Sequence, residues 1–133
     1  MRVPINQLPE IIQNHGFDFH WDNEKVWSLD VTLEDIDIAE LEWIFNYPFW
    51  KNKTKCDLCP NQVMQSIDLY PEHKKRILNA DISHPIDIMK NQLGNWLILD
   101  GMHRLAKLIM EGNKKVKVRK ISREFIPLIE PKQ

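Results

Sequence analysis

Five consecutive residues place a carboxylate, a glycine, an imidazole and a guanidinium directly after an apolar run: Asp100, Gly101, Met102, His103 and Arg104. An Asp-Gly pair is a turn signal, and the residues after it have the periodicity of an amphipathic helix. The first turn of a helix has unpaired N–H groups and the positive end of the helix dipole, and a glycine before it lets an anion approach the backbone. This segment, called the DGMHR corner below, is a candidate phosphate site.

The charges of the corner favour the same interpretation. His103 and Arg104 stand at the end of a helix that normally prefers acidic residues, and such breaks of a local rule tend to occur at functional sites. Lys107 follows Arg104 on the same helical stripe and joins the predicted phosphate ligands. Asp100 is predicted to bind Mg²⁺ or to orient Arg104. The structural alternatives stay open: a turn or cap role for Asp100, a surface position for His103, and an ion pair of Arg104 with Asp87 or Asp100.

The elements that must position the corner are predicted on both sides of it. The pattern predicts a short strand over 85–89, a hairpin turn over 93–95, a return strand over 96–99, a helix over 102–111 that ends at Gly112, and a strand over 115–119. The last strand carries Lys115, Lys117 and Arg119, and we interpret it as a solvated edge because edge strands often carry lysine.

The first 80 residues show weaker patterns. They predict a helix from Asn6 to about residue 14, a strand over 25–31, a cap or turn over 32–35, a helix over 38–45 that ends before Pro48, an irregular loop over 46–61, and helical turns over 62–79 broken at Pro71. Together with the second half, they indicate an α+β (α/β) protein with a small mixed sheet flanked by helices.

Length and composition indicate one domain over residues 1–133. No apolar run approaches the roughly 18 to 20 residues of a membrane span, and the N-terminus lacks the apolar segment of a secretory signal, so we expect a cytoplasmic protein with no membrane partner. The net charge of −1 hides an asymmetry, because residues 1–50 carry 2 basic and 10 acidic residues and residues 101–133 carry 9 basic and 3 acidic ones. This polarity suggests a basic face that meets an anion, or two halves that attract each other.

Two further groups carry chemistry that the corner does not explain. Cys56 and Cys59 form one CxxC pair, whereas a four-ligand metal site needs a second pair and a polar loop does not lower a thiol pKa. We interpret them as incidental thiols, with a redox or half-metal site as the alternative. The same loop contains aromatic residues followed by lysines: Tyr47, Phe49, Trp50, Lys51, Lys53 and Lys55. The aromatic side chains either stack on nucleic-acid bases or pack in the core, and we favour packing in the core.

The run HPIDIMKNQLGNWLILDGMHRLAKLIMEGNKKVKVRKI resembles the core of the ParB/sulfiredoxin-like superfamily. The shared elements are a Pro-Ile strand, a short turn, a strand ending in D-G-x-H-R, a helix, a break at small residues and a valine-rich strand, and the match spans roughly residues 82–121. A strand around 25–33 fits the family's first strand less closely. The resemblance implies a compact ParB/sulfiredoxin-like domain in which Gly101, Met102, His103 and Arg104 bind nucleotide phosphates, with ATP or CTP and Mg²⁺ as the cofactors.

Departures from the family narrow the expected chemistry. Sulfiredoxins carry a catalytic cysteine in G-C-H-R, where this chain has Met102, so that activity is disfavoured. Partition proteins of the family carry G-E-R-R, bind CTP and attach a DNA-binding domain. Here Met102 and His103 replace the glutamate and the first arginine, and we expect no such domain. Other relatives phosphorylate free serine with an acidic residue as the base.

The expected function is binding of a nucleotide or another phosphate anion at the corner, followed by phosphoryl transfer or nucleotide hydrolysis. Asp100 and His103 are the predicted catalytic residues at the corner, and an acid among Glu34, Asp35 and Asp37 is the predicted base. The alternative is a non-catalytic module of the same fold that binds a nucleotide, a nucleic acid or a protein. Nucleic acid is not favoured, because a near-neutral chain does not resemble a dedicated duplex binder. The oligomeric state stays open.

Overall fold

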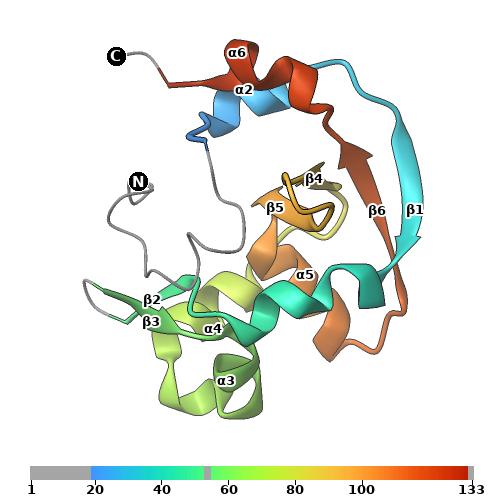
Figure 1. The fold of residues 1–133 in the computed structure, drawn as a ribbon. Helices are drawn as coiled ribbons and strands as arrows, with labels where there is room; N and C mark the ends of the chain where they lie inside the picture. The colour runs from blue at the N-terminus through green and yellow to red at the C-terminus, as the bar shows by residue number, and fades with distance from the viewer. Residues whose placement is uncertain (1–18, 53–54, 132–133) are drawn as a thin grey trace.

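Four strands form a mixed sheet in the order β1-β6-β4-β5 (Figure 1). The structure is a computed structural model that describes residues 19–52 and 55–131. β6 runs antiparallel to β1 and parallel to β4, and β4 and β5 form an antiparallel hairpin. The chain therefore has the α+β architecture with a mixed sheet that the sequence predicts. The strands are β1 (Leu33–Asp37), β4 (Ile86–Lys90), β5 (Trp96–Asp100) and β6 (Lys115–Lys120).

The elements around the DGMHR corner agree with their predicted bounds to within one residue at each end. Helix α5 (Met102–Met110) follows β5 directly and carries the chain back to β6. Gly94 in the β4–β5 turn and Gly112 after α5 have φ of +86° and +85°, a backbone conformation that glycine adopts without a steric penalty. Because both positions require a conformation that favours glycine, the sequence predicted the turn and the end of the helix correctly.

The strand predicted over 25–31 is wrong, because this segment contains a helix, α2 (Asn23–Trp27). The Asp22 carboxylate accepts hydrogen bonds from two backbone N–H groups of the first turn, at 2.9 and 3.4 Å. Such an N-cap stabilises a short helix by about 0.5–2 kcal/mol, which a seven-residue alternation does not outweigh. The sheet instead begins at Leu33, inside the segment that was predicted as a cap or turn.

The segment between β1 and β4 is more regular than predicted. The helix expected over 38–45 consists of two 3-10 turns, and the loop expected over 46–61 contains a hairpin and the start of a helix. The helical turns expected over 62–79 are present, and Pro71 stands in the first turn of its helix, where its missing N–H costs nothing. The elements are η2 (Ile38–Glu40), η3 (Glu42–Asn46), β2 (Trp50–Asn52), β3 (Lys55–Leu58), α3 (Pro60–Gln65), η4 (Ile67–Leu69) and α4 (Pro71–Leu78).

The prediction that the basic strand is a sheet edge is also wrong, since β6 lies between β1 and β4. Its lysines reach acidic residues of β1, with Lys117 Nζ 3.3 Å from Asp35 Oδ1 and Lys115 Nζ 3.8 Å from Asp37 Oδ1. Acidic side chains of β1 therefore pair with basic side chains of β6. This is one of the two explanations that the charge asymmetry left open.

The core lies on the sheet and on helix α5, where Ile88, Leu97, Val118 and Leu105 are all fully buried. Figure 1 shows α2 beside α6 (Ile126–Ile129) at one end of the sheet, and α3, α4 and α5 towards the other end. Within the described part of the chain, no helix is long and apolar enough to cross a membrane. The helix predicted from Asn6 lies outside the described residues.

Candidate functional site

Gly101 joins β5 to α5 in a conformation that only glycine fits. Its φ is +111°, and the helix begins there without a side-chain cap. A Cβ atom at this position would lie 2.7 Å from Cδ1 of buried Ile86 and 2.9 Å from Arg104 Nη2. The Arg104 guanidinium therefore lies directly against the backbone where α5 begins, because helix side chains point back towards the N-terminus.

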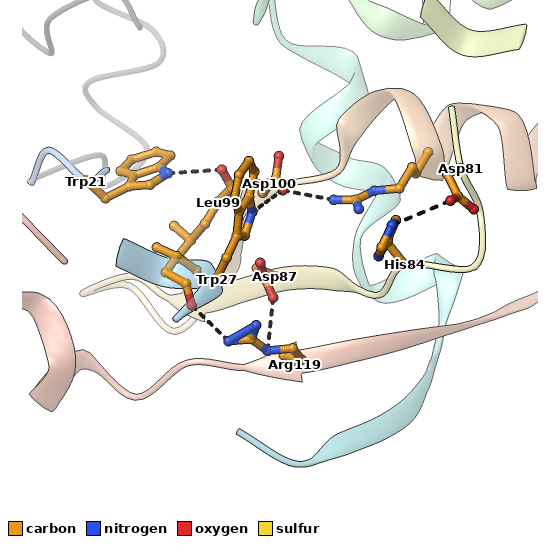
Figure 2. Close-up of polar contacts among 10 residues, drawn as sticks. Trp21, Trp27, Asp81, His84, Asp87, Leu99, Asp100 and Arg119 are labelled. Atoms are coloured by element: carbon orange, nitrogen blue, oxygen red, sulfur yellow. Dashed lines mark hydrogen bonds and ion pairs between the residues drawn. The ribbon is translucent and has the colours of Figure 1, made fainter. Parts of the chain in front are cut away.

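Asp100 orients Arg104, which is one of the two roles predicted for this carboxylate. Its Oδ2 accepts hydrogen bonds from Arg104 Nη2 at 3.0 Å and from Trp27 Nε1 at 2.7 Å. Figure 2 shows the Trp27 contact at the end of β5. The side chains of Asp100 and Arg104 are 22% and 16% exposed, so this ion pair is largely shielded from solvent. The described residues contain no group of three or more His, Cys, Asp or Glu that could hold a metal ion.

A second, buried ion pair joins the neighbouring strands β4 and β6 (Figure 2). Asp87 is the partner of Asp100 in the β4–β5 ladder and of Arg119 in the β4–β6 ladder. Arg119 Nε lies 3.4 Å from Asp87 Oδ1. Arg119 Nη2 donates to the carbonyls of Val26 and Leu29 at 2.9 and 3.0 Å. Burial raises the pKa of Asp87 to about 6, although the Arg119 charge opposes the rise. Through its bonds to Val26 and Leu29, Arg119 joins α2 and the residues after it to the sheet.

His103 belongs to a stack of rings instead of standing at the surface. Its Nε2 lies 3.1 Å from Nδ1 of His73 on α4, so one ring donates a hydrogen bond to the other. Both imidazoles lie flat on the Trp50 indole, with centroid distances of 4.3 Å for His103 and 4.8 Å for His73. Burial, followed by the nearby Arg76 and His73, lowers the pKa of His103 to about 3. His103 is therefore neutral at physiological pH and adds no positive charge to the corner.

The partly buried, neutral state of His103 predicts a loss of stability in acid. Unfolding restores its pKa to about 6.5, so the unfolded chain binds the proton more tightly and stability falls as pH drops below 6.5. We expect wild type to lose on the order of 1–2 kcal/mol more than His103→Gln between pH 7 and pH 5 in urea unfolding. Asp87, whose pKa is raised, acts in the opposite direction, but equally in both proteins.

The exposed His84 offers a control for this measurement, because its ion pair with Asp81 is at the surface, with side chains 65% and 63% exposed, and such a pair contributes little. His84→Gln should therefore change the pH dependence of stability much less than His103→Gln. Parallel pH curves for wild type and His103→Gln would contradict a neutral His103 in the folded protein.

The structure does not bring the predicted acidic base to the corner. Glu34 and Asp35 lie on β1, at the opposite edge of the sheet from β5, which corresponds to three strand spacings or about 14 Å. Glu34 Oε1 lies 3.3 Å from Lys120 Nζ, and Asp35 Oδ1 lies 3.3 Å from Lys117 Nζ. In this position the acids neutralise β6.

Lys107 also has its partners away from the corner. Its Nζ donates to the carbonyls of Leu78 and Ala80, at 2.9 and 3.1 Å. These carbonyls stand at the C-terminal end of α4, where a cation stabilises the unpaired carbonyl groups and the helix dipole. Lys107 thus joins α5 to α4, a role that the sequence did not indicate.

In the segment of the cysteines and aromatic residues, Cys59 and Trp50 make structural contacts, whereas the side chains of Cys56, Lys51, Lys53 and Lys55 are outside the part of the chain that the structure describes. Cys59 directly precedes α3, and its Sγ lies 3.4 Å from the carbonyl oxygen of Asn46. Burial raises the pKa of the Cys59 thiol, which disfavours the reactive thiolate. Trp50 is 4% exposed and holds the two histidines, as the core interpretation of the aromatic residues predicts.

No family model, curated protein or solved structure matches this chain. The protein is an α+β protein with a mixed sheet. Helix α5 follows the edge strand β5, has Gly101 as its N-cap and carries Arg104 in its first turn.

Proposed function

We propose that the protein binds a nucleotide or another phosphate anion at the DGMHR corner. The observation that carries this proposal is the start of α5: a helix of nine residues begins at Gly101 without a side-chain cap, and the Arg104 guanidinium lies against that same backbone. First-turn N–H groups, the helix dipole and a guanidinium all favour a phosphate at one place.

The ion pair with Asp100 leaves Arg104 able to bind a phosphate. Arg104 donates to Asp100 from Nη2, and a guanidinium has five N–H donors in a fixed fork. Asp100 holds the guanidinium in place, which lowers the entropy that binding would otherwise cost. We assign Asp100 to this orienting role, because its Oδ2 accepts hydrogen bonds from both Arg104 and Trp27.

The resemblance to the ParB/sulfiredoxin-like superfamily supports the same class of ligand, ATP or CTP with Mg²⁺. Strand, turn, strand, helix and strand follow one another here in the order that the resemblance implies. The proposal is for binding, with phosphoryl transfer or hydrolysis set aside. The predicted base on β1 lies far from Arg104, and His103 is engaged with His73 and Trp50.

Arg104→Ala is expected to weaken phosphate binding at least tenfold, because a hydrogen bond to a charged group contributes roughly 1.5–3 kcal/mol. The measurement is calorimetric titration of ATP, CTP and tripolyphosphate with Mg²⁺ into both proteins, with phosphate release followed in parallel. Lys107→Ala, three residues along the same helix, should leave affinity unchanged because its ammonium bonds to α4 carbonyls. Absence of binding by all three phosphates would refute the proposal. Binding together with phosphate release would restore the catalytic interpretation.

A further inference from the structure

We propose that Trp27 is the surface on which a planar group of the bound phosphate ligand stacks, an inference that rests on the proposed function. The Trp27 side chain is 54% exposed, although it is one of the largest apolar groups in the chain. Single exposed apolar residues are common in proteins and need no explanation by themselves. Trp27 differs from such residues because its indole is hydrogen-bonded to Asp100 and lies beside Arg104.

The indole is anchored at the corner itself. Trp27 Nε1 donates to Asp100 Oδ2 at 2.7 Å (Figure 2). The same oxygen accepts from Arg104 Nη2 at 3.0 Å. The two nitrogens can be no further apart than the sum of these distances. A phosphate held by Arg104 would therefore lie close to the indole. The base of a nucleotide is joined to its phosphates through the sugar and would then reach the indole ring.

The backbone that carries Trp27 is fastened on both sides. Arg119 binds the carbonyls of Val26 and Leu29, which flank Trp27 in the chain. The start of α2 is tied to α6, because the N–H of Asp22 donates to the Ile129 carbonyl at 2.7 Å. The indole is thus presented in one orientation, and a rigid aromatic ring loses little entropy when a ligand stacks on it.

The chemistry of the indole selects the ligand. An exposed π face stacks on other flat aromatic rings, and a base stacked on an aromatic side chain is a recurrent binding mode for nucleic-acid components. Asp100 uses only the edge of the indole, so the hydrogen bond does not compete with stacking. Trp27 thereby distinguishes a nucleotide from a sugar phosphate or a simple polyphosphate.

The test compares ATP with tripolyphosphate, which has the phosphates but no base, by calorimetric titration with Mg²⁺. Wild type should bind ATP about tenfold more tightly than tripolyphosphate. Trp27→Leu should abolish this preference, so that ATP and tripolyphosphate bind with equal affinity. Trp27→Phe, which keeps a flat ring and loses the Nε1 bond, should keep most of the preference. Leu93→Ala removes an apolar side chain that is 64% exposed in the β4–β5 turn and should change neither affinity.

The outcomes separate this inference from the proposed function. Equal affinity of wild type for ATP and tripolyphosphate would overturn the stacking role while phosphate binding stands. An equal loss of both affinities in Trp27→Leu would also overturn it, because Trp27 would then act only through Asp100. If neither ligand binds to wild type, the proposed function itself fails.

Discussion

Arg119→Met is expected to lower the free energy of unfolding by about 3–5 kcal/mol at pH 7. The side chains of Arg119 and Asp87 are 12% and 4% exposed, so removal of the guanidinium leaves a buried carboxylate without a counter-charge. The substitution also removes the hydrogen bonds to Val26 and Leu29 that hold α2 on the sheet. Urea unfolding measures the loss.

Two comparisons assign the loss to the buried charge. At pH 5 the difference between wild type and Arg119→Met should shrink, because Asp87, with a pKa of about 6 in wild type and higher without Arg119, takes up a proton. The double variant Asp87→Asn/Arg119→Met should recover part of the loss at pH 7, since a buried amide carries no charge.

Lys117 provides a matched control for Arg119 on the same strand and the same face. Its side chain is 66% exposed and its ion pair with Asp35 is at the surface, so Lys117→Met should cost roughly 1 kcal/mol or less. A similar cost for the two substitutions, or a loss at Arg119 that does not depend on pH, would show that the Asp87–Arg119 pair does not stabilise the fold as described.

Gly101→Ala is expected to cost about 2–5 kcal/mol of stability through two additive effects. A residue other than glycine at φ +111° adopts a left-handed conformation that costs about 1–2 kcal/mol. The new methyl group would also meet Cδ1 of Ile86 at 2.7 Å, and forcing an extra carbon into a packed core costs typically 1–3 kcal/mol.

Variants at two other positions separate these effects. Gly94→Ala has a similar backbone, at φ +86°, but no atom within 4 Å of the added carbon, so it should show the conformational cost alone. Ile86→Val removes the Cδ1 atom and should therefore restore part of the stability of Gly101→Ala, although by itself it costs about 0.5–1.5 kcal/mol. Equal losses for Gly101→Ala and Gly94→Ala would mean that the close approach at the corner is not a constraint.

Some of the candidate site was predictable because the residues are close in the chain. Asp100 and Arg104 are four residues apart, so a helix start brings them together whatever surrounds it, and their ion pair is present. Glycine signals at 94, 101 and 112 marked the turn, the corner and the helix end. Each of these glycines has positive φ, which is why the pattern was informative.

Other features depended on contacts across the chain, which single-sequence patterns do not report. His103 and His73 are 30 residues apart, and Trp50 precedes both, so nothing in their spacing indicated a ring stack. Lys107 matched the stripe of Arg104 in the sequence, yet the position of α4 decided its partners. Trp27 was assigned to a strand, and its bond to Asp100 spans 73 residues.

The sequence by itself therefore determined the order of strand, turn, strand, helix and strand around Gly101, because these elements depend on local periodicity and on backbone freedom. Only the tertiary structure decided which charged side chains lie at the DGMHR corner. Partial burial lowers the pKa of His103 and leaves it neutral, and the strand order places the acids Glu34 and Asp35 on β1, far from Arg104. Folding also brought Trp27 and Arg104 to the same oxygen of Asp100. Burial sets the charge state of a side chain, and distance in space sets which groups it can contact, whereas spacing in the chain sets neither.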